Sequence, residues 1–265
     1  MGEDVLSGAV VLMYHALWRS ARERDAIDPA DRPYALQLSE FARQIDMLRE
    51  RGIELLDPAA LRGDTAVRSG VVITFDDGHA SNAQLALPLL RERGLRAAFF
   101  ITTGFVGMRS GYCSVEQLRE LDAAGMEVGG HGHSHRFLSD LADAELESEL
   151  DASRRALREW LGKAPSQMSF PGGRFDPRVL RAAARNGFEL LYGSMPGRIA
   201  LPLDASRVLP RIAVRPGQAA AGFLADARGD AWPLLRARGV YAAKAALRRV
   251  LGNSGYHRLY QRIKG

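Results

Sequence analysis

The chain has 265 residues, of which 46% are hydrophobic and 25% charged, a composition typical of a globular protein. One domain is the simplest expectation, because an α/β barrel needs about 250 residues. A single cysteine, Cys113, excludes an intrachain disulfide, and no apolar run is long enough for a transmembrane helix. The first residues do not resemble a signal peptide, so we expect a cytoplasmic location.

Apolar runs bounded by glycine, proline and capping residues predict strands that alternate with helices. The predicted strands are 9–13, 71–75, 97–102, 126–129, 168–170, 190–192 and 208–214, and the predicted helices are 39–52, 82–93, 114–124, 143–161 and 176–186. Residues 18–32 are charged and contain a proline, so we expect a loop there. This alternation favours βαβ units and a parallel sheet.

The predicted strand at 71–75 ends in two adjacent carboxylates, Asp76 and Asp77, followed by a glycine. Because side chains alternate between the faces of a strand, the two carboxylates can point in different directions and have different roles. Aspartate and glycine are also common turn residues, so this triplet alone fits a simple turn equally well.

Three of the six histidines in the chain, His131, His133 and His135, lie within five residues and are flanked by glycines. A carboxylate and two imidazoles form a common donor set for a zinc ion that keeps one position open for water. The histidine cluster together with the two aspartates therefore predicts a metal site.

Two stretches resemble the first two motifs of the polysaccharide deacetylases, the NodB-homology family or carbohydrate esterase family 4. They are Thr-Phe-Asp-Asp-Gly at 74–78 and His-Gly-His-Ser-His at 131–135. The resemblance implies that Asp76 is the catalytic base and that Asp77, His131 and His135 are metal ligands. It also implies a distorted (β/α) barrel, in which active-site residues lie at the carboxyl ends of the strands.

The third motif of the family is altered here, with Pro-Gly-Gly at 171–173 in place of Pro-Tyr-Gly. The resemblance implies that the Gly172 N–H binds the oxyanion. Many members have an arginine just before this loop that orients the base aspartate. Ser169 occupies that place, and Arg174 or Arg211 could substitute for the arginine.

The general acid is left open by the sequence, because the Leu-x-His motif that supplies it in the family is absent after the third motif. The candidates are His15, His79, His133, or a proton of the metal-bound water passed on through Asp76. His15 follows the first predicted strand in a Met-Tyr-His run that many bacterial members share, which would place it on the catalytic face. A buried histidine satisfied by hydrogen bonds explains it equally well.

The implied activity is metal-dependent removal of N-acetyl groups from an N-acetylated sugar in a polysaccharide or a lipid-linked glycan precursor. Zinc is the expected ion, and cobalt or nickel would fit the same ligands. One alternative is a deformylase or another amide hydrolase of the same fold. Because the fifth motif is missing, a catalytically silent carbohydrate-binding domain is a second alternative. The oligomeric state is not predicted.

The end of the chain is strongly basic. Residues 236–265 contain eight Lys or Arg residues and no acid, so the rest of the chain has a net charge of −3, against +5 for the whole. We therefore divide the chain into a deacetylase barrel at 1–235 and a basic amphipathic helical tail at 236–265. Such a helix can bind peripherally to an anionic membrane, here the inner face of the cytoplasmic membrane, or can cover the barrel with a solvated basic face. Nucleic-acid binding is not expected, because no recognition motif accompanies the charge.

Overall fold

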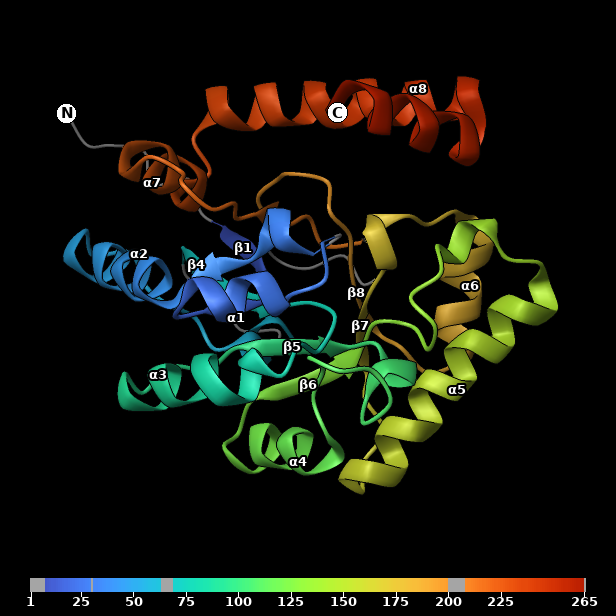
Figure 1. Ribbon diagram of the computed structural model, residues 1–265, viewed down its shortest axis with the longest axis horizontal. Coiled ribbons are helices and arrows are strands. Elements are labelled where there is room, and N and C mark those ends of the chain that lie inside the picture. The colour runs from blue at the N-terminus through green and yellow to red at the C-terminus, as the bar shows by residue number, and fades with distance from the viewer. Residues whose placement is uncertain (1–7, 30, 63–68, 200–207, 265) are drawn as a thin grey trace.

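A curled sheet of seven parallel strands forms half a barrel, in the order β8-β7-β6-β5-β4-β1-β9 (Figure 1). The computed structural model describes residues 8–29, 31–62, 69–199 and 208–264. Strands β2 and β3 make a separate parallel pair. The single α/β domain is the (β/α) barrel that the sequence predicts.

The bounds of the elements follow. The strands are β1 (Ala9–Tyr14), β2 (Leu17–Trp18), β3 (Leu36–Gln37), β4 (Gly70–Phe75), β5 (Ala98–Ile101), β6 (Glu127–Gly130), β7 (Gln167–Ser169), β8 (Leu190–Tyr192) and β9 (Ile212–Ala213). The helices are α1 (Ala21–Ala26), α2 (Leu38–Glu50), α3 (Leu87–Glu92), α4 (Val115–Ala123), α5 (Asp143–Leu161), α6 (Pro177–Arg185), α7 (Ala220–Arg228) and α8 (Ala231–Lys264). The short helical turns are η1 (Arg32–Tyr34), η2 (Pro58–Arg62), η3 (Asn82–Ala86), η4 (Thr103–Phe105), η5 (Leu138–Asp140) and η6 (Pro171–Gly173).

Each predicted strand and helix coincides with an element of the structure, and the structure adds the short strands β2 and β3, which were not predicted. It differs from the prediction at three further places. The expected loop at 18–32 contains α1, which begins where the Ser20 hydroxyl accepts a hydrogen bond from the Glu23 N–H. The strand expected at 208–214 is interrupted: Leu209 makes an isolated parallel bridge with Tyr192, and a regular strand forms only over β9, because Pro210 between them has no N–H for a ladder. Helix α7 was not predicted.

The central strands are buried on both faces, as their β-branched and aromatic residues predict. On the outer face of the sheet Ile73 and Phe75 pack in a cluster with α2, α3 and α4, and Phe75 stacks on Phe99 with 5.0 Å between ring centroids. On the inner face Val72 packs against Phe100 and Tyr192 in a second cluster. The inner face is the concave side of the half-barrel.

The register of the strands brings distant segments together at their carboxyl ends. Tyr14 pairs with Phe75, and the Asp76 N–H donates to the Tyr14 carbonyl at 2.9 Å, so His15 and Asp76 follow neighbouring strands. On the other side of β5, the His131 N–H donates to the Ile101 carbonyl at 2.8 Å. The predicted gathering of these residues at one edge of the sheet is confirmed.

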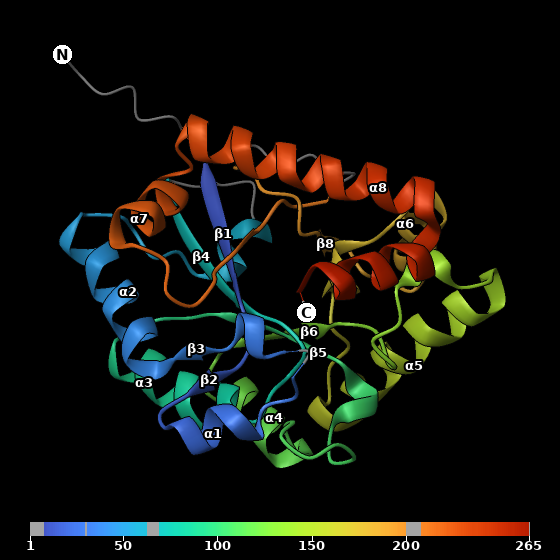
Figure 2. The same ribbon diagram turned by 45° about the horizontal axis from the view of Figure 1, so that its top comes forward.

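Helix α8 lies at the periphery of the molecule, next to α7 and outside the sheet (Figures 1 and 2). The helix begins at Ala231, five residues before the predicted boundary at residue 236, and it includes the predicted tail as far as Lys264. None of the described helices is long and apolar enough to cross a bilayer. The boundary and the cytoplasmic location stay predictions.

Candidate active site

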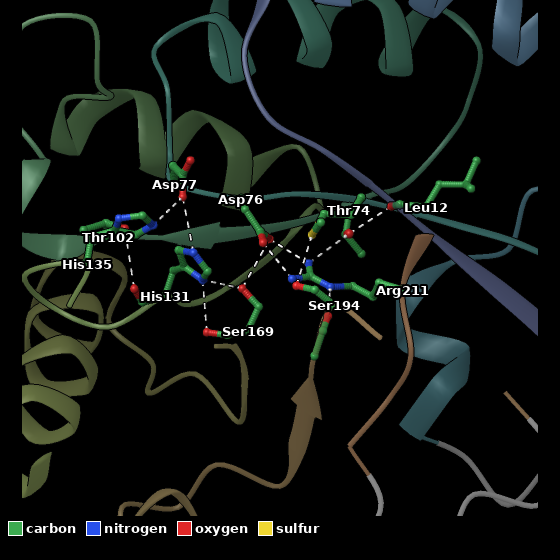
Figure 3. A network of polar contacts seen from close by, with 12 residues as sticks. Leu12, Thr74, Asp76, Asp77, Thr102, His131, His135, Ser169, Ser194 and Arg211 are labelled. Carbon is green, nitrogen blue, oxygen red and sulfur yellow. Dashed lines mark hydrogen bonds and ion pairs between the residues drawn. The ribbon is translucent and has the colours of Figure 1, made fainter. Parts of the chain in front are cut away.

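Asp77, His131 and His135 form a cluster at the carboxyl ends of β4 and β6. Asp77 Oδ1 lies 3.2 Å from His131 Nε2 and 3.1 Å from His135 Nε2, and the three ligand atoms lie within 4.8 Å of one another (Figure 3). Asp77 and His135 have positive φ angles, 74° and 63°, which are uncommon for residues other than glycine. Such strained backbone is typical of functional sites.

The ring of His131 is fixed by Ser169 at the end of β7. His131 Nδ1 lies 3.0 Å from the Ser169 carbonyl oxygen and 2.5 Å from its hydroxyl. Because a carbonyl oxygen only accepts hydrogen bonds, Nδ1 carries a proton, and Nε2 is the ring nitrogen that faces Asp77. Histidines that bind metals are commonly oriented by such a backbone acceptor. The donor set therefore fits a divalent cation.

Asp77 is ionised in this environment. Burial alone would raise the pKa of its carboxyl, but the hydrogen bonds with His131 and His135 outweigh burial and hold the pKa well below its usual value. An ionised carboxylate together with two imidazoles is a donor set that suits Zn²⁺, Co²⁺ or Ni²⁺.

Asp76, the neighbour of Asp77, points to the inner face of the half-barrel and makes a different contact. Its two carboxylate oxygens accept hydrogen bonds from Arg211, at 2.7 Å from Nη1 and 2.6 Å from Nη2 (Figure 3). The side chains of Asp76 and Arg211 are buried. The Ser169 hydroxyl donates a third hydrogen bond to Asp76 at 3.2 Å. Ser169 thus connects the metal cluster to the second carboxylate.

Arg211 is held in place by the walls of the half-barrel. Its Nε donates to the Gly193 carbonyl at 2.8 Å, and its Nη1 donates to the Thr74 hydroxyl at 3.3 Å. Its guanidinium lies 5.5 Å from the ring centroid of Phe100 and 5.9 Å from that of Tyr192. These contacts with the protein therefore fix the orientation of the planar guanidinium, so that both Nη atoms point towards Asp76.

The pKa of Asp76 reflects these contacts. Burial raises it, but the charges of Arg211 and His131 and the hydrogen bonds from Arg211 outweigh burial, and the pKa lies below its usual value. Asp76 is therefore a carboxylate at neutral pH, ready to accept a proton.

Of the two arginines that could contact Asp76, the structure places Arg211 there. Arg174 lies elsewhere: its guanidinium is 3.6 Å from the ring centroid of Phe137 and 4.0 Å from an Asp140 oxygen. Gly172 lies in η6 between Ser169 and Arg174 and has a φ angle of 60°. A Cβ atom at Gly172 would approach Phe137 Cε1 to 2.6 Å, so the turn requires glycine.

The three histidine candidates for the general acid differ in their partners. His79 Nδ1 is bonded to the Ser81 hydroxyl at 2.7 Å, and His133 Nδ1 to the Thr103 hydroxyl at 3.0 Å. His15 Nδ1, by contrast, is buried without a hydrogen-bond partner among the described residues. Burial lowers the pKa of His15 and outweighs the opposing charges of Asp77 and Asp76. Tyr34 packs on the His15 ring with 4.8 Å between centroids.

Glu149 of α5 anchors the loop that carries the histidines. Its carboxylate accepts hydrogen bonds from the His133 N–H at 2.7 Å, from the Ser134 N–H, and from the Ser134 hydroxyl at 3.0 Å. The sequence interpretation missed Glu149, Ser169 as a link, and the cover that Tyr34 gives to His15. The signal for Glu149 was an acidic residue on the buried stripe of α5, next to Leu146 and Leu150, because a buried carboxylate needs a partner.

Comparisons with known proteins agree with this geometry. Residues 63–191 match the family model described as polysaccharide deacetylase. The protein YxkH of Bacillus subtilis is 26% identical over 218 residues, which are 80% of this chain and 74% of YxkH. A peptidoglycan-N-acetylglucosamine deacetylase of Bacillus cereus is 30% identical over 125 residues, 47% of this chain and 56% of that protein.

The fold has solved relatives as well. The structure of IcaB from Ammonifex degensii superimposes with a TM-score of 0.70 at 28% identity, covering 86% of this chain and 97% of IcaB. Residues 63–191, which the family model matches, include both aspartates and the histidine cluster. Residues 63–191 therefore match the polysaccharide deacetylase family, and the chain as a whole is similar to proteins of this kind in sequence and fold.

Proposed function

We propose that this protein is a metal-dependent hydrolase that removes N-acetyl groups from an N-acetylated sugar of a polysaccharide or a lipid-linked glycan precursor. One observation carries the proposal: a two-histidine, one-aspartate cluster lies beside a second carboxylate that Arg211 keeps ionised. The cluster offers metal ligands, and the second carboxylate offers a base.

Asp77, His131 and His135 would hold the metal, with zinc as the first expectation and cobalt or nickel as alternatives. A bound divalent ion would acidify water and polarise the amide carbonyl of the substrate. Among the described residues the cluster contributes three ligand atoms, which leaves one position for water in a four-coordinate site.

Asp76 is the proposed base, since it is ionised and buried and is not one of the clustered ligands. Arg211 holds both of its oxygens, so the carboxylate keeps one orientation while it accepts a proton. The N–H of Gly172 is proposed to bind the oxyanion that forms on the carbonyl oxygen, because the glycine turn η6 follows β7 directly behind Ser169.

His15 is the proposed proton carrier for the departing amine. It follows β1, next to the strand that carries Asp76, and its Nδ1 has no partner among the described residues. The Nδ1 atoms of His79 and His133 are both occupied by hydroxyl groups. Because Nδ1 is itself buried, Nε2 would be the ring nitrogen that exchanges a proton with the substrate nitrogen.

The proposed substrate class follows from the family and from the Bacillus cereus relative, whose name specifies N-acetylglucosamine in peptidoglycan. A deformylase or another amide hydrolase would use the same residues and differ only in the acyl group. A catalytically silent carbohydrate-binding domain would have no use for a base beside a metal cluster. Asp76 and its buried arginine therefore favour an enzyme.

Metal content of the purified protein tests the proposal, with Asp77→Ala and Asp76→Asn as a matched pair. We expect about one ion per chain in the unmodified protein and in Asp76→Asn, and none in Asp77→Ala. Acetate release from N-acetylglucosamine oligomers should follow zinc loading and should be lost in both variants. Full activity after complete metal removal would refute metal dependence, and zinc binding without release of acetate or formate would favour the silent domain.

A further inference from the structure

Helix α8 presents an apolar surface to the outside of the molecule. Trp232 is 79% exposed and Leu235 is 59% exposed, and Val240 and Leu247 are exposed as well. We call these four residues, with the cations Arg236 and Lys244 among them, the outer face of α8. A helix on the surface of a protein normally turns its polar side to solvent, so this arrangement needs an explanation.

The opposite side of α8 is already used for packing. Leu234 is buried in the main core cluster. The Tyr241 hydroxyl donates to the Gly173 carbonyl at 3.4 Å, and Arg238 Nε donates to the Pro196 carbonyl at 2.9 Å. At about 100° per residue, the outer face lies on the far side of the helix from Leu234 and Tyr241. The exposed apolar side chains are therefore not the side by which α8 packs on the barrel.

The charge of α8 limits the kind of partner. The helix from Ala231 to Lys264 contains no acidic residue, and residues 236–265 carry eight Lys or Arg. A second copy of this chain on the same face would bring the cations of two helices together, which is unfavourable. A surface that accepts both tryptophan and lysine is the interface of an anionic lipid bilayer, where apolar side chains enter the boundary region and cations meet the headgroups.

We propose that the outer face of α8 binds peripherally to anionic membranes. Trp232, Leu235, Val240 and Leu247 would enter the headgroup boundary, and Arg236 and Lys244 would contact lipid phosphates. The Tyr241 contact with Gly173 holds the packing side of α8 on the turn that follows β7, which leaves the outer face directed away from the barrel. The inference concerns lipid binding and does not depend on the proposed hydrolase activity.

Vesicle sedimentation with the full chain tests the inference. Phosphatidylcholine vesicles with and without phosphatidylglycerol are compared at low and high salt. We expect binding only to vesicles that contain phosphatidylglycerol, weakened by salt. The double variant Arg236→Gln/Lys244→Gln should bind about 25-fold more weakly, since each cation near an anionic surface contributes about fivefold. The double variant Trp232→Ser/Leu235→Ser should lose at least about tenfold.

Two matched controls separate the outer face from general surface properties. Met108→Ser removes an apolar side chain that is 85% exposed in another part of the surface, and Arg22→Gln/Arg51→Gln removes two exposed cations, one in α1 and one directly after α2. Both controls should bind vesicles like the unmodified chain. Equal binding of all variants, no binding to anionic vesicles, or a dimer in solution that the Trp232→Ser/Leu235→Ser variant dissociates would each overturn the proposal.

Discussion

Arg211 donates two parallel hydrogen bonds to the carboxylate of Asp76, from Nη1 at 2.7 Å and from Nη2 at 2.6 Å, although the two residues lie 135 positions apart in the chain. The arginine lies between Pro210 and β9, the last strand of the sheet, and its side chain reaches across β1 to the end of β4. The orientation of the proposed base therefore depends on the far edge of the half-barrel.

Arg211→Lys should lower kcat by about 100-fold, because lysine keeps the charge but cannot make two parallel hydrogen bonds. Arg211→Met should in addition lower the free energy of unfolding by about 3–5 kcal/mol at neutral pH, since it leaves a buried carboxylate unpaired. Activity assays and denaturant unfolding measure the two effects. Arg174→Lys is the control, and an equal loss in that variant would contradict the role given to Arg211.

Glu149→Ala should weaken zinc binding by about 10–100-fold, because the loop between His131 and His135 loses its anchor. Glu149→Gln should recover most of this affinity, since an amide oxygen still accepts the N–H groups of His133 and Ser134. Competition with a chromogenic chelator measures the affinity. Glu147→Ala, on the same helix but paired with Arg185 at the surface, should bind zinc normally. Loss of thermal stability without loss of zinc affinity would reduce Glu149 to a structural role.

The strands, and the residues at their ends, could be predicted from the sequence because both are local patterns. The β-branched run that ends at Asp76 and Asp77 shows where the strand ends, and the three histidines of the cluster lie within five residues of one another. The fold then has to bring them together, because the carboxyl ends of parallel strands share one edge of the sheet.

The partners of these residues could not be predicted in the same way. Arg211 follows a proline near a two-residue strand, and nothing in its local sequence distinguishes it from a solvated charge at a sheet edge. Glu149 is part of a helix whose periodicity indicates only packing. Both contacts depend on which residues meet in three dimensions, which spacing along the chain does not specify.

His15→Asn should lower kcat by about 100-fold to 10,000-fold while zinc affinity stays unchanged, because His15 is proposed to move a proton and is not one of the clustered ligands. The basic limb of the pH–rate profile should change along with kcat, because a group that gives a proton to the amine must be protonated. His79→Asn is the comparison, and its effect should be much smaller because its Nδ1 is already bonded to Ser81. A greater loss of kcat in His79→Asn would show that His79, and not His15, carries the proton.

Gly172→Ala should reduce activity severely with zinc affinity retained, since a Cβ atom at this position would collide with the Phe137 ring and displace the η6 turn. Gly162→Ala is a matched control: its φ angle is 74°, yet no atom lies within 4 Å of the added Cβ. The control should lose only about 1–2 kcal/mol from backbone strain and remain active. Full activity of Gly172→Ala would show that the η6 turn tolerates a Cβ atom and would contradict the requirement for glycine at this position.

Cys113 should not react with aromatic disulfide reagents at pH 8 until the protein unfolds. Its side chain is fully buried and its thiol contacts the His79 carbonyl at 3.4 Å. Burial raises the pKa of the thiol to about 12, so the reactive thiolate is scarce at pH 8 and the reagent has no access to it. The Cys113 N–H donates to the Gly78 carbonyl at 2.9 Å, so exposure of this thiol would report opening of the loop that follows Asp77. Rapid labelling of the native protein, at the rate of a denatured control, would show that this loop opens readily and would contradict the packing seen here.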